Sequence, residues 1–214
     1  ADESVEHYDH LVIDEAQDLG AIELAVLMAA VKTRTGVTIV GDVNQKIVPD
    51  VDFVGWEALA KELGMGGVDV ARLEVGHRST QPIMQLANHV AGIESSATAR
   101  AGLVPRLERS ETASAALERA AEFLRERAAE VPGAHLCVVC ASRTDIPKTL
   151  EALRTLLAGT SIDVREWHNA SFKFEPGVTV TNWRQIKGLE FDTVVALDPG
   201  SASYPDTTQG RRNL

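Results

Sequence analysis

Apolar residues follow two patterns along the chain: short continuous runs, and longer stretches in which they recur with a helical period. Short runs rich in branched apolar residues are typical of buried strands, and the periodic stretches are typical of amphipathic helices. The runs predict strands at residues 11–13, 37–40, 70–75, 135–141, 162–167, 178–181 and 193–197, and a loop with an edge strand at 103–107. The periodic stretches predict helices at residues 22–32, 54–63, 82–90, 115–129 and 147–158. Because strands and helices alternate, the sequence predicts parallel sheets built from βαβ units, and therefore an α/β fold.

Length, composition and charge narrow the class of protein. The 214 residues are 44% hydrophobic, which is enough for one large or two small domains. A net charge of −10 gives no overall positive field that would draw the chain to nucleic acid or to an anionic membrane, so any DNA contact must be local. No apolar stretch approaches the roughly 18 residues of a membrane helix, and residues 1–10 are too polar and acidic for a signal peptide. We therefore expect a cytoplasmic protein.

The two cysteines, Cys137 and Cys140, lie three positions apart in a predicted strand. Side chains at that spacing on a strand point to opposite faces of the sheet, so the two thiols cannot readily bind one metal ion. We expect both to be buried core residues.

The strongest candidate for chemistry is the acidic segment Asp14-Glu15-Ala16-Gln17-Asp18, which follows the first predicted strand. In open α/β sheets the ligand crevice lies beyond the carboxyl ends of the strands. Asp14 could hold Mg²⁺ there through a water molecule, because Mg²⁺ keeps much of its hydration and takes one or two carboxylates together with substrate phosphates. Glu15 could then orient or deprotonate the water that attacks a phosphoryl group. The alternative is a solvated acidic turn, or an acidic helix N-terminus that the helix dipole favours.

Three further segments carry polar residues just beyond predicted strands. They are Gly41-Asp42-Val43-Asn44-Gln45, then Gly76-His77-Arg78-Ser79, and then Lys187-Gly188-Leu189-Glu190-Phe191-Asp192 with Arg184 ahead of it. If the second strand lies parallel to the first, Asp42 and Gln45 come near the acidic segment, and Gln45 could hydrogen-bond the attacking water or a terminal phosphate. A glycine such as Gly188 lets the backbone approach a phosphate, and a carboxylate such as Glu190 can bond a ribose hydroxyl. Taken singly, each segment could equally be a polar turn, and Arg78 a surface ion-pair partner.

In this order and spacing the four segments resemble motifs II, III, IV and V of superfamily 1 helicases of the UvrD/Rep/PcrA type, and residues 210–214 resemble the opening of motif VI. The resemblance implies a RecA-like P-loop NTPase fold. Residues 1–79 would form the C-terminal part of the first RecA-like lobe, and residues 80–214 most of the second lobe. The short distance from Ser79 to Lys187 leaves no room for a large inserted 2B subdomain. In this compact arrangement the chain is more similar to helicase IV (HelD-like) members.

The resemblance also implies the cofactors ATP and Mg²⁺, single-stranded DNA as partner, and a role for each candidate residue. Asp14 would bind the metal, Glu15 would activate water, Gln45 would sense that water, and Arg78 would stabilise the transferring phosphoryl group as an arginine finger. The remaining contacts would be Asp42, His77, Gly188 and Glu190 to the nucleotide, and Arg184 and Lys187 to DNA. His77 stands where the family has a tyrosine that stacks on adenine, and an imidazole can stack less extensively.

Two departures from the family pattern leave other functions open. The run after Gln45 lacks the aromatic residues that stack on DNA bases in the family, and we expect Phe53 and Trp56 to be core residues. The 214 residues contain no Gly-x-x-x-x-Gly-Lys-Ser/Thr loop, so we expect this chain alone not to hydrolyse ATP. The alternatives are a helicase-like interaction module acting on RNA polymerase or a repair partner, and a non-catalytic paralogue.

Overall fold

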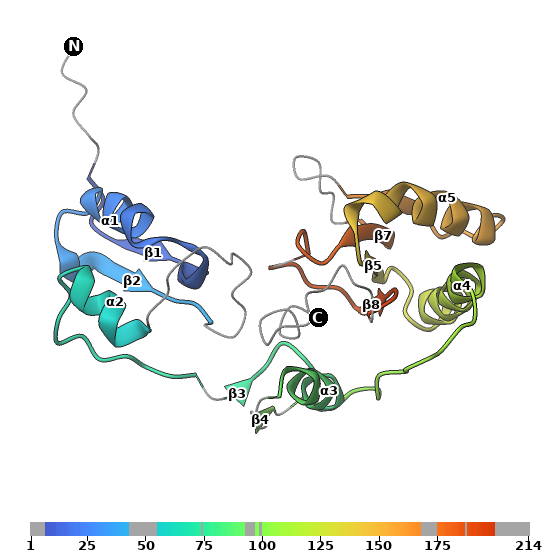
Figure 1. The fold of residues 1–214 in the computed structure, drawn as a ribbon, viewed down its shortest axis with the longest axis horizontal. Coiled ribbons are helices and arrows are strands. Elements are labelled where there is room, and N and C mark those ends of the chain that lie inside the picture. Colours follow the sequence, from blue (N-terminus) through green and yellow to red (C-terminus); the bar gives the residue numbers. More distant parts are fainter. Residues whose placement is uncertain are drawn as a thin grey trace, which may run out of the picture. The chain divides into compact units, whose positions relative to one another are not determined.

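The chain forms two compact units of α/β structure (Figure 1). The computed structural model describes residues 7–42, 55–73, 75–92, 97–98, 100–167, 175–186 and 188–199. The contacts divide the chain into Ala1–Leu103 and Val104–Arg212. This division falls further along the chain than Ser79, where the sequence places the boundary between two RecA-like lobes, and the assignment of those lobes stays a prediction.

The first unit begins with two parallel strands and two helices. Strand β1 (Leu11–Ile13) pairs in register with strand β2 (Val37–Ile39), and helices α1 (Ala21–Ala29) and α2 (Trp56–Glu62) pack on them (Figure 1). Their shared core consists of Ile13, Ala16, Leu24, Met28, Leu59 and Leu63. All four elements confirm the predictions from hydrophobic pattern, and the parallel pairing brings the carboxyl ends of β1 and β2 to one edge.

The rest of the first unit contains strand β3 (Val75–Gly76), helix α3 (Gln81–Ala91) and strand β4 (Ala97–Thr98), with β3 and β4 parallel. Helix α3 has proline in its first turn and ends at Gly92, whose φ of 64° is the left-handed conformation that glycine adopts without strain.

Two predicted strands are wrong. Of the described residues in the range 70–75, only Val75 belongs to a strand, and Leu73 is 98% exposed. Residues 103–107 are not a strand, and their three large apolar side chains are exposed. An apolar run becomes a strand only when a neighbour supplies backbone hydrogen bonds and covers one face, and no such neighbour pairs with these residues in the described part of the chain.

The second unit is a four-stranded parallel sheet with two helices. Its elements are α4 (Ala113–Glu130), β5 (His135–Cys140), α5 (Ile146–Leu156), β6 (Val164–Glu166), β7 (Gly177–Asn182) and β8 (Thr193–Ala196). The strand order is β6-β7-β5-β8. All six elements were predicted, and the α/β fold with parallel sheets flanked by helices is confirmed.

The sheet of the second unit is buried on both faces at its centre. One face carries Leu136, Val138 and Cys140 of β5 beside Val178 and Val180 of β7, and α4 and α5 pack on it. The opposite face carries Cys137, Val139, Thr179 and Thr181, which are also buried. The two cysteines therefore lie on opposite faces as free, buried thiols, as predicted.

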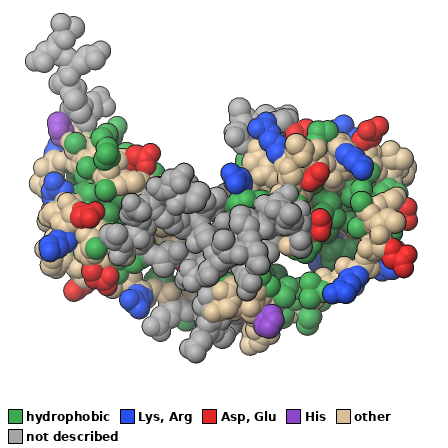
Figure 2. All heavy atoms as spheres, viewed as in Figure 1, with side chains coloured by type: hydrophobic (Ala, Val, Ile, Leu, Met, Phe, Trp, Pro, Cys, Tyr) green, Lys and Arg blue, Asp and Glu red, His purple; other side chains and the backbone are tan. Residues whose placement is uncertain are grey.

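The surface carries both charged and apolar side chains, and Ile22, Leu73 and Leu107 are among its exposed large apolar residues. Acidic and basic side chains are interspersed over the described residues of the face shown in Figure 2. Among the helices of the described residues, none combines the length and the apolar content that a membrane crossing requires.

Candidate functional site

The acidic segment forms a tight turn at the carboxyl end of β1. Asp14 is exposed, and Glu15 has a left-handed backbone with φ 54° and ψ 35°. A single 3-10 turn, Ala16–Asp18, follows. The turn is fixed to the end of β2, because the Ala16 N–H donates to the Val40 carbonyl (3.1 Å) and the Val40 N–H donates to the Ile13 carbonyl (2.9 Å). The two adjacent carboxylates are thus held at the edge where parallel strands end, the usual place of a ligand crevice.

A buried amide connects the acidic turn with the segment after β2. Gln17 is fully buried; its Nε2 donates to Glu15 Oε2 (2.6 Å), and its Oε1 accepts the Asp42 N–H (2.9 Å). Asp14 Oδ1 accepts the N–H of Glu15 (2.7 Å). Gln17 therefore connects the Glu15 carboxylate with the backbone of Asp42, and Asp14 precedes Glu15 in the same turn. Gln45 lies outside the described residues.

Gly41 leaves the space that Gln17 occupies. A Cβ built on Gly41 would lie 2.2 Å from Gln17 Oε1, 3.0 Å from Trp56 Cη2 and 3.1 Å from the Ala16 nitrogen. Trp56 packs against the core of the first unit as predicted, whereas Phe53 lies outside the described residues. The glycine of the Gly41-Asp42 pair is therefore required by packing against the acidic turn.

The carboxylates of the turn suit a magnesium ion that also binds phosphate. Among the described residues no group of three or more His, Cys, Asp and Glu side chains is arranged to hold a metal ion. Mg²⁺ needs no such cage, since it binds through one or two carboxylates with water and substrate phosphates as its other ligands. Exposed Asp14 at the strand end fits that donor set.

His77 and Arg78 lie directly after β3. Strand β3 pairs with β4 in a two-stranded sheet that is separate from the sheet of β1 and β2. The side chains of His77 and Arg78 are both exposed. The Arg78 carbonyl accepts from Arg100 Nη1 (3.0 Å), and the Gln81 N–H donates to the Arg100 carbonyl (2.8 Å). These bonds fix the backbone that leads into α3.

In the second unit the turn after β7 is a compact polar network. Thr181 Oγ1 and Asn182 Nδ2 both donate to Gln185 Oε1, at 3.0 and 2.9 Å, and Asn182 Oδ1 accepts the Arg184 N–H (3.0 Å). The Arg184 guanidinium lies 4.8 Å from the centre of the Trp183 ring, in cation–π geometry. The predicted DNA contact Arg184 is thus an exposed cation on an ordered turn at a strand end.

The glycine and acid that follow this turn are accessible. Gly188 has a φ of 80°, nothing lies within 4 Å of a Cβ built on it, and both it and Glu190 are exposed. Lys187 lies outside the described residues. Asp192 ends the segment and joins it to β5: its Oδ2 accepts the His135 N–H (2.8 Å), and its own N–H donates to the His135 carbonyl (2.9 Å).

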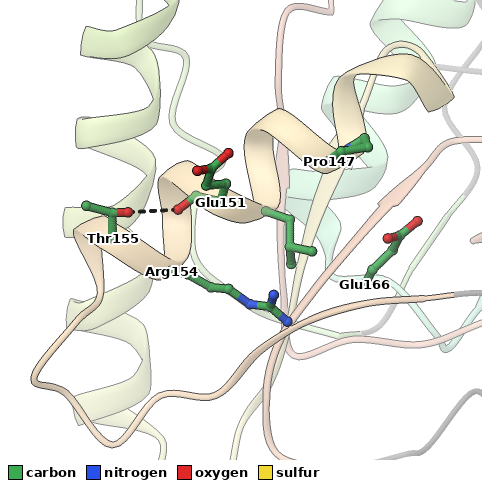
Figure 3. Close-up of a pocket in the computed structure, with 6 residues that line it drawn as sticks. Pro147, Glu151, Arg154, Thr155 and Glu166 are labelled. Atoms are coloured by element: carbon green, nitrogen blue, oxygen red, sulfur yellow. Dashed lines mark hydrogen bonds between the residues drawn. The ribbon is translucent and has the colours of Figure 1, made fainter.

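Figure 3 shows a pocket elsewhere in the second unit, between α5 and β6. Arg154 Nε donates to the Val164 carbonyl (3.0 Å), and Thr155 Oγ1 donates to the Glu151 carbonyl (3.0 Å). The six residues that line it are Pro147, Leu150, Glu151, Arg154, Thr155 and Glu166, none of which is a candidate from the sequence.

Sequence reasoning missed two residues that organise these segments, Gln17 and Asp192. Glutamine and aspartate are mostly exposed in proteins, so their types gave no sign of a structural contact. The available signal for Gln17 was its position two residues after Glu15, in a segment that must turn back toward the end of the next strand. Asp192 offered a weaker signal, as an acid immediately before a predicted strand.

Comparison with known proteins finds similarity over part of the chain. The family model described as an AAA domain matches residues 1–49, which contain β1, the acidic turn and β2. ATP-dependent DNA helicase UvrD2 of Mycobacterium bovis, and that of two strains of Mycobacterium tuberculosis, are 34% identical to the chain over 90 residues. The match spans 42% of this chain and 13% of the length of each relative. The chain is thus similar, over part of its length, to an AAA domain and to UvrD2 helicases, and its parallel sheets flanked by helices are consistent with a RecA-like P-loop fold.

Proposed function

We propose that the protein carrying this chain is an ATP-dependent DNA helicase or translocase, which couples Mg-ATP hydrolysis to movement on single-stranded DNA. The observation that carries the proposal is the geometry of the acidic turn. Two adjacent carboxylates lie at the carboxyl ends of parallel strands, and the second is held by a fully buried amide. A solvated acidic turn would need no such support.

The two carboxylates would have different roles. Asp14, exposed at the strand end, would hold Mg²⁺, which supplies positive charge to neutralise the phosphates. Glu15, partly buried and hydrogen-bonded, would orient the attacking water and accept its proton. Asp42 would contact the nucleotide from the end of β2, and Gln45 would hydrogen-bond the attacking water.

The other candidate residues would complete the site and the DNA contact. Arg78 would stabilise the transferring phosphoryl group, a role that suits a planar and permanently charged guanidinium. His77, Gly188 and Glu190 would contact the nucleotide. Arg184 and Lys187 would bind the DNA backbone, giving the local positive charge that a chain of net charge −10 requires.

The test is the Glu15→Gln variant of the full product of the gene that encodes this chain. A glutamine keeps the size of the side chain and cannot accept the proton, so we expect kcat for ATP hydrolysis to fall by about 10²- to 10⁴-fold. Binding of ATP, measured by calorimetry with Mg²⁺ present, should persist. The matched control is Glu57→Gln on the exposed face of α2, which should hydrolyse ATP at the wild-type rate.

The same assay, run with and without an oligothymidylate strand, tests the DNA partner. We expect single-stranded DNA to stimulate hydrolysis by the wild-type protein. Full activity of Glu15→Gln would contradict the proposal. Stimulation by RNA polymerase or a repair protein in place of DNA would favour the interaction module.

A further inference from the structure

Gln17 is a buried polar side chain, and both the nitrogen and the oxygen of its amide form hydrogen bonds. It has no exposed surface, and leaving either of its polar groups unpaired at such a position would be destabilising. Its Nε2 and Oε1 contact two different segments, the acidic turn and the end of β2. Any polar group could serve as hydrogen-bond partner to a buried amide. The partner of Gln17 Nε2 is the carboxylate of Glu15, the candidate base.

The orientation of the Gln17 amide is fixed by chemistry. The Asp42 N–H can only donate and the ionised Glu15 carboxylate can only accept, so Oε1 must face Asp42 and Nε2 must face Glu15. Rotation of the amide by half a turn would break both bonds. The close approach of Gly41 to Gln17 Oε1 leaves the side chain little room to move away.

We propose that Gln17 is a positioning residue for ATP hydrolysis, which holds the Glu15 carboxylate in place and ties it to the end of β2 at Asp42. The inference rests on the proposed function. The bond from Nε2 restrains the carboxylate while leaving its charge in place, and the bond to the Asp42 N–H anchors the amide to the end of β2. Gln17 therefore links the Glu15 carboxylate to the backbone of Asp42.

The test is a double-mutant cycle in the full gene product, with single-stranded DNA present. Gln17→Met keeps the length of the side chain and removes both hydrogen bonds, and we expect kcat to fall by about 10- to 100-fold. Because Gln17 is not proposed to touch ATP, KM should stay within about twofold of the wild-type value. In a Glu15→Gln background Gln17→Met should cause no further loss, since the group that it positions is already inactive.

Two further variants separate positioning from folding. Gln17→Glu keeps the size of the side chain and the acceptor for the Asp42 N–H, but it places a second carboxylate against Glu15. We therefore expect it to lower kcat as well. If Gln17→Met does not fold, Gln17→Glu replaces it in the double-mutant cycle. Thr149→Val removes a buried hydroxyl from the second unit, where Thr149 Oγ1 lies 3.5 Å from the Cys140 thiol, and should leave kcat unchanged.

The outcomes distinguish this inference from the function on which it rests. Wild-type kcat in Gln17→Met, or a loss that multiplies with that of Glu15→Gln, overturns the positioning role while the proposed hydrolysis stands. Unchanged activity of Glu15→Gln alone overturns the proposed function, and this inference with it.

Discussion

At the scale of single residues, the site depends on close packing between Gly41 and the acidic turn. Any Cβ at position 41 would lie within 2.2 Å of Gln17 Oε1, so Gly41→Ala must displace the Gln17 amide or the end of β2. We expect the free energy of unfolding of the first unit to fall by about 1–3 kcal/mol, as for other overpacked positions. Amide hydrogen exchange of β1 and β2 measures this loss.

Gly66→Ala is the control for that experiment. A Cβ on Gly66 meets nothing within 4 Å, and its φ is not in the left-handed range. The control should therefore change the free energy of unfolding by no more than about 0.5 kcal/mol. Equal effects of the two substitutions would show that Gln17 moves aside without cost.

The residue types could be predicted from sequence, but their connections could not. Asp14, Glu15 and Asp42 are recognisable as acids that follow apolar runs, because strand ends can be located from local pattern. The link through Gln17 depends on the register of β1 and β2, which brings Ile13 opposite Ile39 and thereby sets Gln17 beside Asp42. Register is a property of two strands, so one segment's sequence does not contain it.

At the scale of elements, β5 carries the largest shift in acidity that the structure resolves. Burial, and then the neighbouring Cys140, raise the pKa of Cys137 from 9.0 to about 12. In the unfolded chain the thiol ionises above pH 9.0, whereas in the folded chain it stays protonated up to about 12. The stability that this difference contributes is complete below pH 9.0 and is lost as the pH rises toward 12.

We therefore expect the free energy of unfolding of the second unit to fall across that alkaline range, and to fall less in Cys137→Ala. Urea unfolding of both proteins, at a pH below 9.0 and at one near 12, measures the difference. Apart from Cys140, which interacts with Cys137, the other groups that titrate in this range are common to both proteins. Identical alkaline losses in the two proteins would contradict the shift at Cys137.

Helices could be predicted from the sequence because their signals are local, whereas some strands could not be predicted. The pattern at residues 115–129 predicts a helix, and α4 (Ala113–Glu130) begins two residues earlier because Thr112 Oγ1 accepts the Ala115 N–H (3.1 Å). Residues 70–75 have the composition of a strand, but among those that the structure describes only Val75 pairs, with Ala97 of β4. Strand formation depends on a partner elsewhere in the chain, which composition does not reveal.

At the scale of the whole molecule, each unit has its own core. Leu24 belongs to the core of the first unit and Leu153 to that of the second, and both are fully buried. Each Leu→Ala substitution should destabilise its own unit by about 2–5 kcal/mol. We expect Leu24→Ala to increase amide hydrogen exchange in β1 and β2, and Leu153→Ala to do so in β5 and β7.

Each variant serves as the control for the other, because the substitution is the same and only the unit differs. Increased exchange in both units from either single substitution would show that they unfold together, as one cooperative structure.

The strand order of the second unit also determines when that unit can fold during synthesis. Strand β5 lies between β7 and β8, and both of its partners come later in the chain. Until Ala196 has left the ribosome, the apolar strand His135–Cys140 lacks β8 on one of its two edges. Contacts between residues so distant in sequence slow folding, and an unpaired apolar edge is a site of aggregation. The nascent second unit therefore exposes an apolar strand edge until its last strand emerges.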